Sequence, residues 1–100
     1  YCIVGHTHHQ LTFRDDEGQV EALLADDGGQ LTLDERRCIL NPGSVGQPRD
    51  GDPRGCAMTV ETDGGRVEWL RFDYDIASTQ ADIRALPLPG RLADRLELGV

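Results

Sequence analysis

The stretch YCIVGHTHHQ, residues 1–10, contains all three histidines of the chain behind a short apolar run. The first four residues have the composition of a buried strand, and Gly5 allows the backbone to turn sharply after it. In an extended segment, side chains two residues apart point to the same side, so we expect His6 and His8 to project together. This arrangement favours a metal site over a surface cluster, and His9 is interpreted as a rim residue. Two histidines do not complete such a site, because a closed one needs about four ligands.

The composition around this stretch is that of one soluble domain at most. The chain has 100 residues, 38% apolar and 28% charged, and no run approaches the roughly 20 apolar residues of a membrane span. The net charge of −8 argues against a nucleic-acid ligand bound without sequence preference, since such proteins present positive surface to phosphates. Cys2, Cys38 and Cys56 form no CxxC pair, and we interpret them as reduced thiols of a cytoplasmic protein.

Strand patterns dominate the first three quarters of the chain. Residues 56–60 and 67–74 alternate, and the DGG at 63–65 predicts a hairpin between them. Apolar side chains fall on both faces of 67–74, so both faces are expected to be covered. The VEALL segment at 20–24 is a short apolar piece between turn-rich loops. The expected strands are residues 1–4, 10–13, 31–33, 38–40, 56–60 and 67–74.

Two short helices are expected after the strands. Asp75 can cap the N-terminus of a helix that continues through about Ala85. Pro89 suits the first turn of a second helix, and Gly99 suits its end. The chain is thus predicted to be of the α/β (α+β) class.

Two motifs give the chain a resemblance to a known family. GHTH after an apolar strand, followed by NPGSVGQPRDGDPR at residues 41–54, resembles the C-terminal half of a calcineurin-like metallophosphoesterase of the compact bacterial and archaeal type. The tail from Phe72 onward is similar to the strand and two helices that end such proteins. The resemblance implies a four-layer αββα sandwich with a dinuclear metal site at strand ends. This chain would supply its C-terminal strands and two short terminal helices.

The resemblance also implies a function. The first histidine of GHTH, His6, would bind one metal ion and the second, His8, the other, with manganese, zinc, iron or nickel as the pair of divalent ions. The activity implied is hydrolysis of phosphomonoesters or phosphodiesters by a metal-activated hydroxide, with a small phosphate ester as substrate. A non-catalytic scaffold or binding protein of the same fold, like the retromer subunit of this shape, is the alternative.

The other metal motifs of the family do not occur in this sequence. There is no Asp-x-His and no GNHD, and the one GD, Gly51-Asp52, lies in the Pro/Gly-rich loop. We therefore expect residues 1–100 to be the C-terminal half of a single domain whose N-terminal half carries the remaining ligands. No catalytic residue is assigned within this half, and half a core predicts an unstable isolated chain.

The NPGS loop offers candidates for support and for substrate binding. Asn41 or Ser44 would orient the GHTH backbone or a metal-ligating histidine, although a plain turn joining strands is the alternative. Arg49 and Arg54 present planar forks suited to phosphate. The alternative for both is a solvated position or a salt bridge to a nearby aspartate: Asp15, Asp50 or Asp52.

Overall fold

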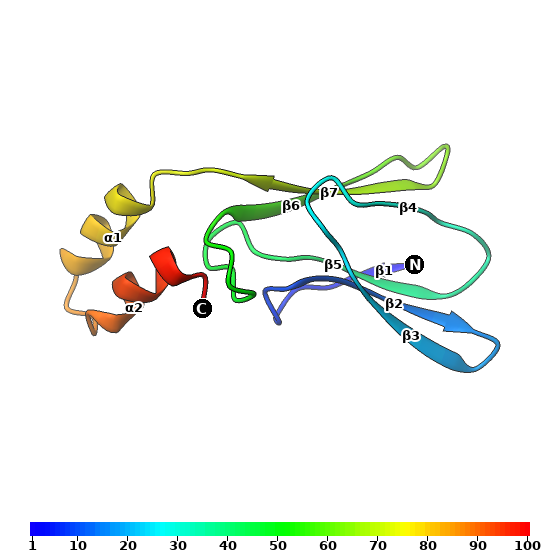
Figure 1. The fold of residues 1–100 in the computed structure, drawn as a ribbon, viewed down its shortest axis with the longest axis horizontal. Coiled ribbons are helices and arrows are strands. Elements are labelled where there is room, and N and C mark those ends of the chain that lie inside the picture. The colour runs from blue at the N-terminus through cyan, green and yellow to red at the C-terminus, as the bar shows by residue number, and fades with distance from the viewer.

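The computed structural model describes residues 1–100 as two β-sheets followed by short helices (Figure 1). The first sheet has the order β1-β5-β2-β3 and contains β1 (Cys2–Ile3), β2 (Gln10–Asp16), β3 (Gln19–Leu24) and β5 (Cys38–Pro42). The second sheet has the order β4-β7-β6 and contains β4 (Gln30–Thr32), β6 (Gly55–Val60) and β7 (Arg66–Phe72). The mixed α/β class, the two sheets and the short terminal helices confirm the predicted fold class.

The core lies between the two sheets. Cys38 and Leu40 of β5 pack with Val67 and Trp69 of β7, and all four are buried. The alternation along β7 therefore turns one of its two predicted apolar faces, that of Val67 and Trp69, toward the core. On its other face, Leu70 and Phe72 are 36% and 40% exposed, so the expectation that both faces are covered is wrong within this chain. The partly buried residues around the cluster are Ala25, Leu31, Leu33, Met58 and Val60.

The pairing of β1 with β5 decides where the two motifs meet. The two strands are parallel, with Ile3 opposite Leu40, so their carboxyl ends lie at the same edge of the sheet. GHTH follows the end of β1, and NPGS begins at the end of β5. β2 starts at this edge as well, because Gln10 pairs with Pro42. GHTH and NPGS, which are distant in the sequence, therefore lie at the same edge of the sandwich.

The six expected strands are all present, with ends shifted by a few residues. β3 was not expected, because its sequence QVEALL carries no clear alternation of apolar and polar residues. In the structure all six of its residues are exposed. It forms through a two-residue turn in which Glu17 and Gly18 both have positive φ, 53° and 88°. Positive φ at both central residues is the requirement of the type I′ turn, whose usual sequence signals are Asn-Gly and Asp-Gly.

The helices are α1 (Ile76–Arg84), α2 (Arg91–Asp94) and the 3₁₀ helix η1 (Arg95–Leu98), which lie beyond the strand ends near the β5–β6 loop (Figure 1). Asp75 caps α1 as predicted, since its Oδ1 accepts from Ser78 N at 2.8 Å. Gly99 ends η1 in the left-handed conformation with φ of 65°. The placement of Pro89 in a first helical turn is wrong, because Gly90 is the N-cap of α2.

None of these helices has the length and apolar character needed to cross a membrane.

Candidate metal-binding site

The GHTH segment forms a tight turn rather than an extended strand. Thr7 N donates to the Gly5 carbonyl at 3.1 Å, which closes a three-residue turn around His6. His6 and His8 both have left-handed backbones, with φ of 78° and 63°. The expectation of an extended segment is therefore wrong. A left-handed backbone costs a non-glycine residue about 1–2 kcal/mol, so surrounding contacts must hold this shape.

The His8 ring is held by the long loop between β5 and β6. Its Nδ1 lies 2.6 Å from the Gln47 carbonyl oxygen. A carbonyl can only accept, so Nδ1 carries the proton and the neutral ring has its lone pair on Nε2. His8 is half-buried, and its own carbonyl accepts from Arg49 N at 3.4 Å. His6 is exposed, and no corresponding contact orients its ring.

Asn41 ties the end of β5 to the histidine turn. Its side chain is 1% exposed, and Nδ2 donates to the Gly5 carbonyl at 3.0 Å and to Thr7 Oγ1 at 2.9 Å. Its Oδ1 accepts from Gly43 N at 3.0 Å. The amide thus uses both donors and its acceptor, and the two donors hold the residues on either side of His6.

Ser44 acts on His8 through Gln47. The Ser44 hydroxyl accepts from Gln47 N at 3.0 Å and from Gly46 N at 3.3 Å, which closes the loop on itself. The Gln47 carbonyl then meets His8. Gln47 was not among the residues selected from the sequence, because the acceptor is a backbone atom and no residue type signals it.

Arg49 and Arg54 differ in their surroundings. Arg54 pairs with Asp52 at 2.7 Å and with Asp27 at 2.8 Å, so the salt-bridge alternative is right for Arg54. The hydrogen bond from Arg54 lowers the pKa of Asp52 to about 2. Arg49 is exposed and forms no ion pair; its Nη2 lies 3.5 Å from Gln47 Oε1. The Arg49 side chain therefore has no carboxylate partner, and the residue adjoins His8 through its backbone N–H.

The side chains present fit part of a metal centre. His8 offers Nε2 with its other nitrogen fixed by a carbonyl, which is the usual arrangement for a metal-ligating histidine. No group of three His, Cys, Asp or Glu side chains that could hold an ion occurs in this chain, whereas a closed site needs about four ligands. The chain thus contains two candidate ligands, His6 and His8, and no third His, Cys, Asp or Glu side chain completes a group with them.

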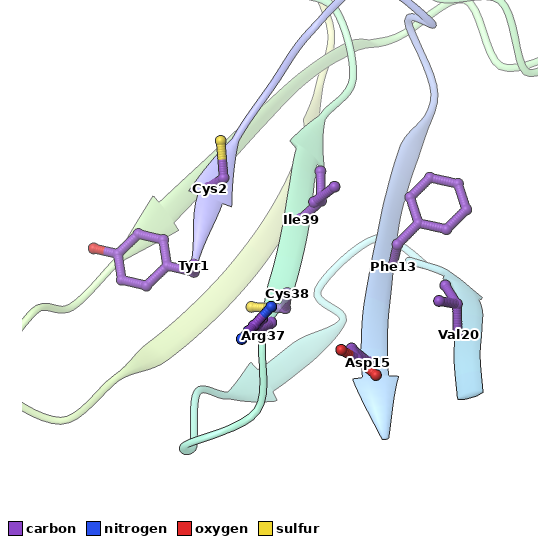
Figure 2. Close-up of a pocket in the computed structure, with 8 residues that line it drawn as sticks. All are labelled: Tyr1, Cys2, Phe13, Asp15, Val20, Arg37, Cys38 and Ile39. Atoms are coloured by element: carbon purple, nitrogen blue, oxygen red, sulfur yellow. The ribbon is translucent and has the colours of Figure 1, made fainter. Parts of the chain in front are cut away.

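The largest cavity lies elsewhere, on the outer side of the first sheet. It has a volume of about 380 Å³ and is mostly apolar (Figure 2). None of the six candidate site residues named from the sequence lines it. Its lining consists of Tyr1, Cys2, Phe13, Asp15, Val20, Arg37, Cys38 and Ile39.

Comparisons with known proteins identify the fold. No protein-family model matches the chain. Among solved structures, the chain is similar to a metallophosphoesterase from Sphaerobacter thermophilus, with 48% sequence identity and a TM-score of 0.92. That match covers 99% of this chain and 42% of the other. Among curated proteins, the chain is 37% identical to an uncharacterized protein of Methanocaldococcus jannaschii, over 96% of this chain and 38% of that protein.

The resemblance to calcineurin-like metallophosphoesterases is therefore confirmed, and this chain has the fold of the matching part of such a protein. It spans less than half the length of either relative.

Proposed function

We propose that this chain is part of a metal-dependent phosphoesterase that hydrolyses phosphomonoesters or phosphodiesters. The observation that carries the proposal is the His8 ring, whose Nδ1–H is held by the Gln47 carbonyl so that Nε2 is left to bind a metal. The similarity to a metallophosphoesterase over 99% of the chain supports this class of reaction. In the proposal, His6 and His8 each ligate one of two divalent ions: manganese, zinc, iron or nickel. When bound, such a pair supplies an activated water and neutralises phosphate oxygens.

The residues of this chain have three tasks in that reaction. Asn41 holds the turn around His6, so that the two imidazoles are presented from a fixed backbone. The Gln47 carbonyl keeps the proton of His8 on Nδ1 and away from the ligating nitrogen. Arg49, which no carboxylate neutralises, offers its guanidinium to an anionic group of the substrate. Each task prepares the site before the substrate arrives, which lowers the cost of organising it during the reaction.

We further propose that residues 1–100 are the C-terminal half of a single domain. The remaining ligands, including the carboxylate that bridges the two ions, would come from the rest of the protein. The greater length of both relatives supports this division. The three free cysteines, two of them buried, support the expected cytoplasmic location.

The test uses the complete protein and three alanine variants. We expect His6→Ala to remove mainly one ion and His8→Ala mainly the other, measured as metal content per protein. Hydrolysis of an aryl phosphate and of an aryl phosphodiester should fall by about 100-fold or more in both variants, because the nucleophile and the substrate clamp need the pair. His9→Ala is the matched control and should keep metal and rate near wild type.

Two outcomes would contradict the proposal in different ways. Full metal content and normal rates in His6→Ala and His8→Ala would remove these residues from the site. A complete wild-type protein that binds metal but hydrolyses neither ester would favour the scaffold alternative.

A further inference from the structure

Arg71 of β7 is linked to the loop that holds His8. Its side chain is only 8% exposed, and its guanidinium forms two hydrogen bonds with the Asp50 carboxylate, one of them 3.2 Å from Nη1 to Oδ1. Nη1 also lies 4.0 Å from Asp52 Oδ2. The paired oxygens match the planar fork of arginine, which lysine cannot reproduce.

Holding the charges of Arg71 and Asp50 partly away from water costs free energy. Burial disfavours the charged form of Asp50, but the hydrogen bond and charge of Arg71 outweigh burial, and the pKa of Asp50 lies below its usual value. Removing Asp50 would leave the partly buried Arg71 with only Asp52, 4.0 Å away, as a counter-charge. The pair is only partly buried, with the Arg71 and Asp50 side chains 8% and 20% exposed, so its net contribution to stability is expected to be small and its effect on the loop conformation is the point of interest.

The conformation in question is that of the loop beside the histidines. Asp50 follows Arg49, whose N–H meets the His8 carbonyl, and lies three residues after Gln47, whose carbonyl meets His8 Nδ1. Glycines at 46 and 51 leave the loop backbone free to move unless it is anchored. Arg71 supplies one anchor, at Asp50, from a strand whose partner β6 begins directly after the loop. The Ser44 hydroxyl, which accepts from Gln47 N, and the Gly99 carbonyl, which accepts from Gly51 N, are others.

We infer that Arg71, through its ion pair with Asp50, is a positioning residue that holds the Gln47 carbonyl in place and thereby fixes the His8 tautomer that can bind metal. This inference rests on the proposed metal site. It adds to that proposal a residue that touches neither metal nor substrate.

The test uses the complete protein with labelled histidine side chains. In the metal-free wild type, the ring nitrogen shifts of His8, assigned by their loss in His8→Ala, should report a proton on Nδ1. In Asp50→Asn and Arg71→Met they should report a mixture of tautomers. The dissociation constant for Mn²⁺ or Zn²⁺ should rise by about 10–100-fold, the usual effect of losing a partner that orients a ligand.

Two further variants make the result specific. Arg71→Lys keeps the charge but loses the paired hydrogen bonds, so its effect should lie between those of wild type and Arg71→Met. Asp34→Asn breaks an exposed ion pair with Arg36 at the opposite end of β5 and should change neither readout.

The outcomes separate this inference from the proposed function. Folded Asp50→Asn protein with an unchanged His8 tautomer and unchanged metal affinity would overturn the inference, even if Arg71→Met fails to fold. If the wild type bound no divalent ion, the proposed function would fail, while the tautomer measurement in metal-free protein would still decide the role of Arg71.

Discussion

At the scale of single residues, Arg49 is the candidate for binding an anionic group of the substrate. It is exposed, forms no ion pair and follows the loop segment that holds His8. We expect Arg49→Gln in the complete protein to raise KM by about tenfold with little change in kcat, the size of one lost charge-assisted hydrogen bond. Steady-state kinetics on an aryl phosphate measures both constants.

A second unpaired arginine provides the control for this prediction. Arg66 is exposed at the start of β7, far along the strand from the site, and Arg66→Gln should leave KM unchanged. An equal rise in both variants would indicate a general charge effect, and no rise in Arg49→Gln would exclude contact with the substrate.

Sequence reasoning located the residues of the candidate site better than it described their geometry. GHTH and NPGS were expected to lie together, and the Asn41 side chain does bond to Gly5 and Thr7. The left-handed backbones of His6 and His8 were not expected, because positive φ is uncommon for any residue other than glycine, even though histidine adopts it more often than most. Their metal-binding roles stay predictions.

At the scale of elements, the β5–β6 loop is held by ion pairs that depend on pH. The pKa of Asp52 is lowered from 3.8 to about 2 by its hydrogen bond from Arg54. A lowered folded-state pKa means that this carboxylate stabilises the fold fully above 3.8 and progressively less as the pH falls toward 2. We expect Asp52→Asn to flatten the acid dependence of the free energy of unfolding in that window.

The effect should be modest, about 1 kcal/mol or less, because the pair is partly exposed. Urea unfolding of the complete protein across the window measures it. Asp73→Asn, an exposed aspartate without an ion pair, is the control. An unchanged slope in Asp52→Asn would show that the pair does not contribute to stability.

Elements with their own sequence pattern were predicted, and elements that depend on a partner were not. The alternation of residues 56–60 and 67–74 and the cap at Asp75 are local signals, and the hairpin and α1 follow them. β3 depends on its pairing with β2, including the ion pair between Arg14 and Glu21. Such pairing is a property of two segments together, so no pattern within residues 19–24 reveals it.

At the scale of the whole molecule, the chain is less compact than an independent domain of its length. Its radius of gyration is 15.7 Å, against about 13 Å expected for a compact domain of 100 residues. Only 14 of the 100 residues are buried, so the hydrophobic contribution to stability is small. Apolar side chains on the outer face of the first sheet, such as Phe13, Val20 and Ile39, remain in contact with water.

We therefore expect the isolated 100-residue chain to unfold without a cooperative thermal transition and to aggregate through the exposed edge strand β3. Circular dichroism melting and light scattering measure these properties, with the complete protein as the control. A sharp transition in a monomeric sample of residues 1–100 would show that this part of the protein folds independently.

The position of the candidate site at one edge of the sandwich also bears on how such a protein can diversify. The core residues Leu40 and Val67 lie between the sheets, whereas His8 and its partners lie in turns beyond the strand ends. Trp69 joins the two regions, because its indole N–H donates to the Asn41 carbonyl. Volume-conserving exchanges at core positions other than Trp69 can accumulate without disturbing the turns. Conversely, the turns can be remodelled for new substrates on an inherited scaffold.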